Sequence, residues 1–320
     1  MAFAKTRANR CGSPRRVLLA TPRGFCAGVV RAIDAVERAL ATYGPPVYVR
    51  RPIVHNQAVI ARLERLGAIF VPEVADVPEG AVLIVSAHGV ARAVRQSAGQ
   101  HRVLDATCPL VSKVHAHVLA QHAAGRHVLL IGHSGHPETV GTIGQVPAGS
   151  ITLVANEGNL AELDLPARLP VAYAVQTTFS VAEARALIDA IEARFDDVVG
   201  PRAGNICYAT TNRQSAIEAI AREADYVLVV GDASSSNANR LVEVAAAAGT
   251  GPATLIGSQL DLDWVLVEAS QTIGMTAAAS TPAHIVDSIC DALAERGFVI
   301  SEQTGVEEDV HFKPLVLDAP

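Results

Sequence analysis

Apolar and polar positions along the chain predict short buried strands that alternate with amphipathic helices. Runs such as AVLIV (81–85) and HVLLIG (127–132) are typical of strands buried in a sheet. Between such runs, apolar residues recur at helical spacing, as in residues 29–44. Alternating strands and helices predict an α/β fold with mostly parallel sheets.

One pattern occurs three times: a strand, a cysteine in a turn, a helix, a second strand and a polar loop. The first loop residue follows its cysteine by 28 to 30 residues, in the pairs Cys26–His55, Cys108–His136 and Cys207–Asn237. A second polar loop, 62 to 73 residues after each cysteine, carries His88, Thr177 and Ser280. Such self-similarity predicts three α/β units, each contributing one cysteine and two polar loops.

The repeat sets the expected domain boundaries. Three units are predicted at residues 17–100, 101–200 and 201–300, each within the usual domain size. Residues 1–16 carry five Lys or Arg and no acid, and we expect a disordered tail in which Cys11 has no role. Residues 301–320 are expected to be a C-terminal tail that packs late or stays loose.

Composition narrows the functional class. The net charge of −6 argues against non-specific nucleic-acid binding, and no apolar run approaches the length of a membrane span. Five widely spaced cysteines do not resemble a disulfide framework. A chain with unpaired thiols fits a reducing cytosol, so a cytoplasmic location is expected.

The three repeated cysteines are candidate metal ligands. A single cysteine is usually a small core residue, and Cys290, in the middle of a predicted helix, keeps that interpretation. Cys26, Cys108 and Cys207 differ because each lies in a turn at the carboxyl end of a strand, where ligands bind in α/β sheets. If the units pack about a pseudo-threefold axis, the sulfurs converge. Three thiolates suit a [4Fe–4S] cluster with one open iron, or a zinc ion with a water, and the absence of CxxC pairs favours the cluster.

The polar loops are predicted to form a ring of hydrogen-bond donors around the cysteines. Most precede a helix, so backbone N–H groups also point inward, which suits a small multiply charged anion such as a diphosphate. The ring consists of His55, His88, His136, Thr177, Ser235, Ser236, Asn237 and Ser280. Glu138 is the one carboxylate among them, and either caps a helix or donates a proton to a reacting carbon. The remaining histidines are expected to be structural (His133) or solvated (His115, His117, His122 and His127).

The motifs that carry these residues resemble the LytB (IspH) family, reductases of the last step of the methylerythritol phosphate isoprenoid pathway. The resemblance runs from about residue 17 to the GVEEDVHF segment, through RGFCAGV, IVHN, SAHGV, DATCPLV, GHSGHPE, QTT, ICYATTNRQ, SSN and TAAASTP. It implies a trefoil of three pseudo-threefold-related α/β domains around a central iron–sulfur cluster. It also implies reduction of (E)-4-hydroxy-3-methylbut-2-enyl diphosphate to isopentenyl and dimethylallyl diphosphate, with the substrate hydroxyl at the open iron.

The resemblance also implies residue roles. Cys26, Cys108 and Cys207 would hold one [4Fe–4S] cluster per chain, and Glu138, Thr177 and His136 would be catalytic. The substrate would be bound by His55, His88, His136, Thr177, Ser235, Ser236, Asn237 and Ser280, with Thr177 at its hydroxyl end and the others at its diphosphate. The implied electron donor is ferredoxin or flavodoxin.

Three positions depart from the family pattern, namely Val30, Asn205 and Ala278, which leaves open a paralogue with an altered rate. Ala278 would crowd the Ser280 loop if the backbone there required a positive φ. Two other functions stay open at this point. One is a three-unit [4Fe–4S] dehydratase similar to quinolinate synthase, and the other is a zinc or redox sensor without turnover.

Overall fold

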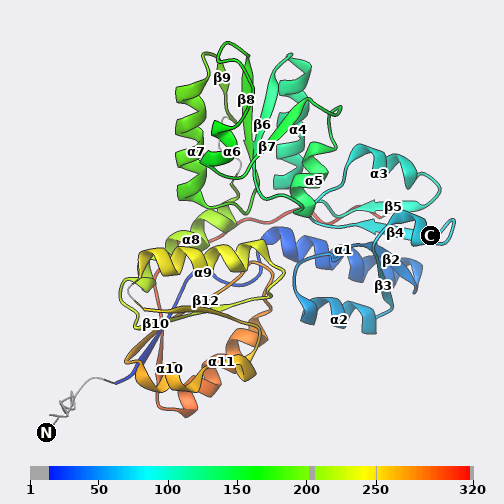
Figure 1. Cartoon of the computed structure of the whole chain (residues 1–320). Helices are drawn as coiled ribbons and strands as arrows, with labels where there is room; N and C mark the ends of the chain where they lie inside the picture. Colours follow the sequence, from blue (N-terminus) through cyan, green and yellow to red (C-terminus); the bar gives the residue numbers. More distant parts are fainter. Residues whose placement is uncertain (1–13, 202–205, 250, 318–320) are drawn as a thin grey trace, which may run out of the picture.

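The computed structural model describes residues 14–201, 206–249 and 251–317 (Figure 1). Residues 1–13 of the predicted N-terminal tail, with Cys11, lie outside this range, as does Asn205. The described chain is an α/β structure of three separate sheets, and every strand pair in them is parallel. The predicted fold class is therefore confirmed.

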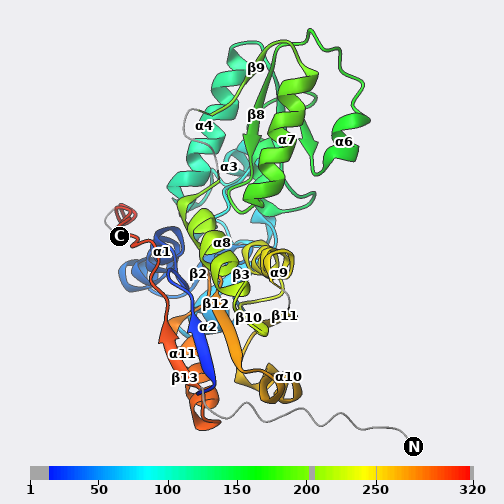
Figure 2. The same cartoon turned by 90° about the vertical axis from the view of Figure 1, so that its left-hand side faces the viewer.

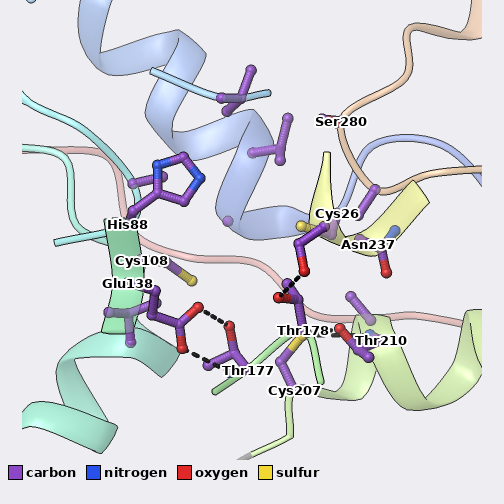
Figure 3. Close-up of a pocket in the computed structure, with 18 of the residues that line it drawn as sticks. Cys26, His88, Cys108, Glu138, Thr177, Thr178, Cys207, Thr210, Asn237 and Ser280 are labelled. Atoms are coloured by element: carbon purple, nitrogen blue, oxygen red, sulfur yellow. Dashed lines mark hydrogen bonds between the residues drawn. The ribbon is translucent and has the colours of Figure 1, made fainter. Parts of the chain in front are cut away.

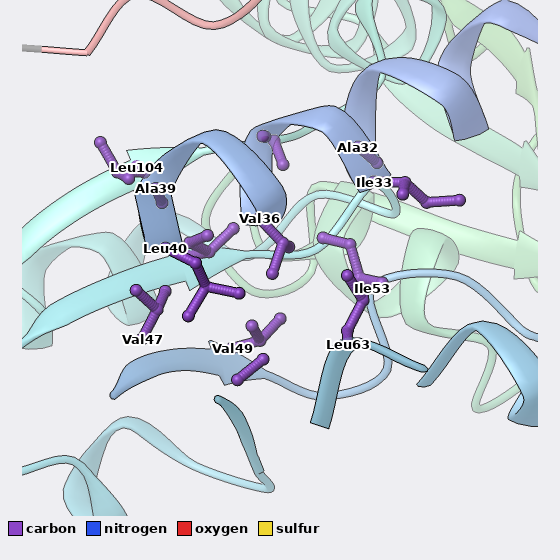
Figure 4. Close-up of a cluster of buried hydrophobic side chains, with 14 of the residues drawn as sticks. Ala32, Ile33, Val36, Ala39, Leu40, Val47, Val49, Ile53, Leu63 and Leu104 are labelled. Carbon is purple, nitrogen blue, oxygen red and sulfur yellow. The ribbon is translucent and has the colours of Figure 1, made fainter. Parts of the chain in front are cut away.

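The first sheet has the order β3-β2-β4-β5. Its strands are β2 (Val47–Arg50), β3 (Ala68–Val71), β4 (Val82–Val85) and β5 (Arg102–Asp105). Its helical elements are α1 (Ala27–Tyr43), α2 (Gln57–Arg65), η1 (Val74–Asp76) and α3 (Arg92–Ser97). The apolar face of α1 packs against this sheet, with Val36 and Leu40 facing Val47 and Val49 (Figure 4). Burial of this face, rather than local propensity, anchors α1 and the turn before it.

The second sheet has the order β7-β6-β8-β9. Its strands are β6 (His127–Ile131), β7 (Ile151–Val154), β8 (Val171–Val175) and β9 (Val198–Val199). Its helices are α4 (Pro109–Ala123), α5 (Pro137–Ile143), α6 (Glu157–Ala161) and α7 (Val181–Arg194). The predicted N-cap of α7 is confirmed, because the Ser180 side chain accepts a hydrogen bond from the Glu183 N–H.

The third sheet has the order β11-β10-β12-β1-β13. Its strands are β1 (Arg16–Leu19), β10 (Tyr226–Val230), β11 (Ala253–Ile256), β12 (Thr272–Ala277) and β13 (Val299–Glu302). Its helical elements are α8 (Tyr208–Ala221), α9 (Ser236–Ala248), η2 (Gln259–Asp261), α10 (Trp264–Ala269) and α11 (Ala283–Glu295). Cys290, on α11, packs against the apolar core of this unit, as predicted.

Strand pairing differs from the unit order read along the sequence. β1 pairs with β12 and β13 of the third sheet, although the sequence assigned it to the first unit. β5 pairs with β4 of the first sheet, although the sequence assigned it to the second unit. In each case the strand before the cysteine belongs to one sheet, and the helix after it packs on the next. The cysteines therefore lie at the three crossings between units.

The C-terminal segment, defined here as residues 303–317, lies along the junction of the units rather than hanging loose (Figure 2). The Gln303 N–H bonds to the carbonyl of Leu19 on β1. Further along, Leu315 and Leu317 pack against the core under α1. Of the two alternatives for this tail, the loose one is wrong for these residues, because the Gln303 N–H bonds to β1 of the third sheet while Leu315 and Leu317 pack on the first unit.

Candidate active site

Each of the three repeated cysteines occupies the N-cap position of a helix. Cys26 precedes α1, Cys108 precedes α4 and Cys207 precedes α8. Pro109 begins α4, where its missing N–H costs no hydrogen bond. The positive end of each helix dipole thus lies beside a sulfur, which favours a thiolate there.

All three cysteines line one pocket at the junction of the units (Figure 3). Its empty volume is about 730 Å³, including the part open to solvent. Every residue predicted for the site lines it, namely Cys26, His55, His88, Cys108, His136, Glu138, Thr177, Cys207, Ser235, Ser236, Asn237 and Ser280. The structure therefore brings together side chains that are spread over more than 250 residues of sequence.

Gly28 leaves open the space between two of the sulfurs. A Cβ atom at this position would lie 2.8 Å from Cys108 Sγ and 3.8 Å from Cys26 Sγ. Any side chain here would enter the space that a shared ligand of the two thiols needs. Glycine on the first turn of α1 is thus explained by the pocket and not by helix propensity, which disfavours it.

Two of the thiols are strongly perturbed by their surroundings. Burial raises the pKa of Cys108 to about 11 and that of Cys207 to about 12; Cys26 adds to both shifts, and Cys108 adds to that of Cys207. The Cys207 sulfur also contacts Thr210, at 3.4 Å from the backbone N–H and 3.2 Å from the hydroxyl. Converging buried thiols are costly as anions unless a metal centre compensates their charge.

The residues fit a multi-iron cluster better than a single ion. Within the described ranges, no group of three or more His, Cys, Asp or Glu side chains is arranged to hold a metal ion directly. The fit to a larger cluster depends on other observations: three free thiols on helix N-termini around one cavity, and the open space at Gly28. A cluster with three cysteine ligands keeps one iron free of protein.

Three histidines form one wall of the pocket. The ring centroids of His55 and His88 are 4.4 Å apart, and each lies 5.8 Å from the centroid of His136. Burial lowers the pKa of His136 to about 4 and that of His88 well below its usual value, and the neighbouring imidazoles contribute to both shifts. His136 Nδ1 accepts a hydrogen bond from the Glu138 N–H, which leaves Nε2–H as its donor. This wall is therefore neutral at neutral pH.

Several polar atoms in the pocket are buried without a partner. They are His55 Nε2 and both side-chain polar atoms of Asn237. Asn237 lies on the first turn of α9, which begins in the pocket, and the Ser235 hydroxyl caps that helix by accepting from Ala238 N–H. A buried polar group that has no partner within the protein normally bonds to a ligand or a water. This part of the pocket is thus suited to a polar, anionic group.

Glu138 is buried and held by a single residue. Its Oε1 accepts from the backbone N–H of Thr177 and its Oε2 from the Thr177 hydroxyl, both at 2.7 Å. Burial raises the pKa of Glu138 to about 7, against the opposing effect of these two hydrogen bonds. The helix-capping interpretation of Glu138 is wrong, because the His136 ring caps α5. A carboxyl with this pKa can carry and release a proton near neutral pH.

Two polar residues that line the pocket, Thr178 and Thr210, were not predicted from the sequence. Thr178 and Gln176 contact Ser236 through side-chain hydrogen bonds, so the second and third units meet there. The QTT motif contained Thr178, and Thr210 lies three residues after Cys207, at hydrogen-bonding distance on a helix N-terminus. These positions offered a signal that was not used.

One expectation outside the site needs correction, and one conditional expectation does not apply. His115 was expected to be solvated but is 6% exposed, because its ring packs against Gly89. Ala278 was expected to crowd its loop if a positive φ was needed. Arg51 is the one non-glycine residue in the described part of the chain with positive φ, so Ala278 is not strained in this way. Val30 is half exposed and outside the pocket.

The fold and site define a class: an α/β protein with three sheets and a three-thiol pocket at their junction. The family model described as LytB protein matches residues 17–294, and the chain belongs to this family. Family membership implies an iron–sulfur reductase. None of the described helices is long and apolar enough to cross a membrane.

Relatives and solved structures agree with this assignment. The chain is 50% identical to the 4-hydroxy-3-methylbut-2-enyl diphosphate reductase of Burkholderia pseudomallei, over 93% of this chain and 96% of the relative. It is 48% identical to the reductase of that name from Methylocella silvestris, over 93% and 95%. The solved structure of E-1-hydroxy-2-methyl-but-2-enyl-4-diphosphate reductase from Plasmodium falciparum matches with a TM-score of 0.92 and 36% identity, over 95% of this chain and 96% of that one.

Proposed function

We propose that this protein reduces (E)-4-hydroxy-3-methylbut-2-enyl diphosphate to isopentenyl and dimethylallyl diphosphate. The observation that carries the proposal is that one pocket joins three free thiols, a buried carboxyl with a pKa of about 7, and unpartnered donors beside a helix N-terminus. Relatives named for this reductase cover nearly the whole chain.

The cofactor is one [4Fe–4S] cluster per chain, held by Cys26, Cys108 and Cys207. When bound, it supplies electron transfer and one iron without a protein ligand that can act as a Lewis acid. The open space at Gly28 and the thiol positions at three helix N-termini support this assignment.

The diphosphate is bound by the donor ring. Its neutral imidazoles and hydroxyls donate hydrogen bonds, and the α9 N-terminus adds backbone N–H groups and a favourable dipole. Its members are His55, His88, His136, Ser235, Ser236, Asn237 and Ser280. Because burial keeps the histidines neutral, affinity depends on geometry and hydrogen bonding more than on net positive charge.

Glu138 supplies protons, and Thr177 orients it. The reaction consumes two electrons and two protons, breaks the allylic C–O bond and releases water. Thr177 fixes both carboxyl oxygens, so the proton is delivered from one position. Protonation at either end of the allyl system gives the two products. The electrons come from an external carrier, ferredoxin or flavodoxin.

The test is turnover by anaerobically reconstituted protein with reduced viologen as the electron source. Substrate-dependent oxidation of two viologens per product, with both diphosphates formed, is the expected result. The Cys207→Ser variant is the matched control, and it should lose the reaction. A cluster-loaded protein that leaves the substrate unchanged would contradict the proposal and return attention to a dehydratase or a sensor.

A further inference from the structure

A buried arginine lies close behind the cysteine pocket. Arg213 is on α8, six residues after Cys207, and is 1% exposed. It does not line the pocket, and the proposed reaction gives it no role. A buried guanidinium is costly unless all its donors are used, so its partners show what it holds together.

Arg213 joins the backbones that flank two of the cysteines. Its Nε and Nη2 donate to the carbonyl of Gly24, at 3.3 and 2.8 Å, and its Nη1 donates to the carbonyl of Ala209 at 3.0 Å. Gly24 is two residues before Cys26, and Ala209 is two residues after Cys207. One side chain therefore ties the turn of the first thiol to the helix of the third.

The turn at Gly24 is also held by contacts that do not involve Arg213. Gly24 has a φ of +67°, which suits glycine, and its N–H bonds to the carbonyl of Ala277. The Cys26 N–H bonds to the carbonyl of Ala279. The turn is thus fixed to the end of β12 on one side and to Arg213 on the other, so movement of Arg213 acts directly on the Cys26 backbone.

The charge of Arg213 is matched by the C-terminal segment. Glu308 accepts from Arg213 Nη1 and Nη2 in a bidentate pair at 3.0 and 3.2 Å, and from Asn212 Nδ2 at 3.1 Å. The side chain of Glu308 is 14% exposed. In each of the other arginine–carboxylate pairs among the described residues, at least one of the two side chains is about a third exposed or more. This pair is set apart by burial on both sides.

The C-terminal segment is anchored on both sides of Glu308. Gln303 bonds to β1, while on α1 Arg31 Nε donates to the Lys313 carbonyl and Arg38 Nη1 to the Leu315 carbonyl. Figure 1 shows this red segment running from the third unit to the first, past α8. Glu308 is thus delivered to Arg213 by a segment that spans the same two units as the two thiols.

We propose that Arg213 and Glu308 are a positioning pair that sets the spacing of the Cys26 and Cys207 thiols and the charge around the cluster they hold. This proposal depends on the cluster assigned under the proposed function. Arg213 acts through the Gly24 and Ala209 carbonyls, and Glu308 keeps the guanidinium in place and offsets its charge. The C-terminal segment is thereby part of the cluster site, although none of its residues lines the pocket.

Two substitutions separate the geometric and the electrostatic parts. Arg213→Lys keeps the charge but loses the planar fork, so Gly24 or Ala209 loses its donor. Glu308→Gln keeps the shape but removes the negative charge. The matched controls are Arg50→Lys and Glu73→Gln, because Arg50 is also buried and paired with a glutamate, in the first sheet.

The measurements on anaerobically reconstituted protein are iron and sulfide content, the rate of cluster loss to a chelator, the EPR spectrum of the reduced cluster and its midpoint potential. Arg213→Lys is expected to lose the cluster about 10-fold faster and to alter the EPR spectrum. Glu308→Gln is expected to shift the midpoint potential to more positive values, because a negative charge near the cluster is removed. The control variants are expected to match the wild type in all four.

The proposal is overturned if both variants keep wild-type cluster loss, EPR spectrum and potential, even when their melting temperature falls, because that is the result of a purely structural ion pair. If Arg213→Lys does not fold, the potential of Glu308→Gln decides alone. A wild-type protein that binds no cluster on reconstitution contradicts the proposed function instead, so the two failures are distinguishable.

Discussion

Thr177 donates to both carboxyl oxygens of Glu138, from its backbone N–H to Oε1 and from its hydroxyl to Oε2, each at 2.7 Å. The two residues are 39 positions apart in the second unit, with Glu138 on the first turn of α5 and Thr177 in the loop after β8. This clamp holds a carboxyl that is 1% exposed in one orientation beside the thiols. The clamp gives Glu138 a fixed direction, while burial raises its pKa to about 7, and these are the two properties that a proton donor needs.

Removal of the acid should stop turnover without preventing binding. Glu138→Gln keeps the shape and the hydrogen bond from Thr177 N–H, but it cannot release a proton. We expect kcat to fall by about 10²- to 10⁴-fold, with the substrate dissociation constant little changed. Steady-state kinetics and calorimetry check this, with the exposed Glu218→Gln as control. A Glu138→Gln enzyme with near wild-type kcat would show that the proton comes from elsewhere.

Asn237 should matter for ligand binding and not for folding. Both polar atoms of its buried amide lack a partner, so Asn237→Leu replaces an uncompensated polar side chain with an apolar one of similar size. We expect the ligand-free protein to melt at the same temperature or higher, while the diphosphate binds at least about 10-fold more weakly. Thermal unfolding and calorimetric titration measure the two effects. A large loss of stability with unchanged affinity would mean that Asn237 is part of the structural core.

A side chain at position 28 should exclude the cluster while leaving the fold intact. Gly28→Ala places a Cβ 2.8 Å from Cys108 Sγ, but alanine is favoured over glycine in a helix. We therefore expect iron content after reconstitution to fall well below that of the wild type, with the melting temperature of the cluster-free chain unchanged or raised. Iron analysis and thermal unfolding of the same preparation are sufficient. Full iron content in this variant would contradict the position assigned to the cluster.

His115 should make the fold less stable in mild acid. Burial lowers its pKa from 6.5 to about 4, with Arg95 lowering and Asp105 raising it. The folded state therefore keeps the ring neutral, while the unfolded chain takes up a proton below pH 6.5. The contribution of His115 to the free energy of unfolding is fully present above pH 6.5. About 3 kcal/mol of it is lost as the pH falls towards 4.

The check is denaturant unfolding between pH 7 and pH 4 for wild type and His115→Leu. The variant should lose this part of the pH dependence, and the exposed His311→Gln should not. Equal slopes for wild type and His115→Leu would assign the acid sensitivity to other groups.

The sequence predicted much of the site because the relevant residues recur at matched positions. Cys26, Cys108 and Cys207 each follow a strand and begin a helix, and this local order is visible in a single chain. The polar loops were found for the same reason. Helix ends such as Ser180 were predictable because capping depends on residues a few positions apart.

Other features depend on partners that are distant in sequence. Nothing in the run that forms β1 shows that it pairs with β12, more than 250 residues later. The burial of His115 depends on which face of α4 meets the Gly89 loop. Arg213 and Glu308 are 95 residues apart, and an arginine on a helix or an acid in a tail is usually solvated. Tertiary packing decides these cases.

The central claim is that the three thiols hold a [4Fe–4S] cluster that meets the diphosphate substrate. The most direct measurement is a Mössbauer spectrum of anaerobically purified, iron-57-labelled protein, with and without (E)-4-hydroxy-3-methylbut-2-enyl diphosphate. The account predicts a [4Fe–4S] signal with one distinct iron whose parameters change when the substrate is added. A cluster that does not respond to the substrate, or a protein that holds zinc and no iron, would contradict it.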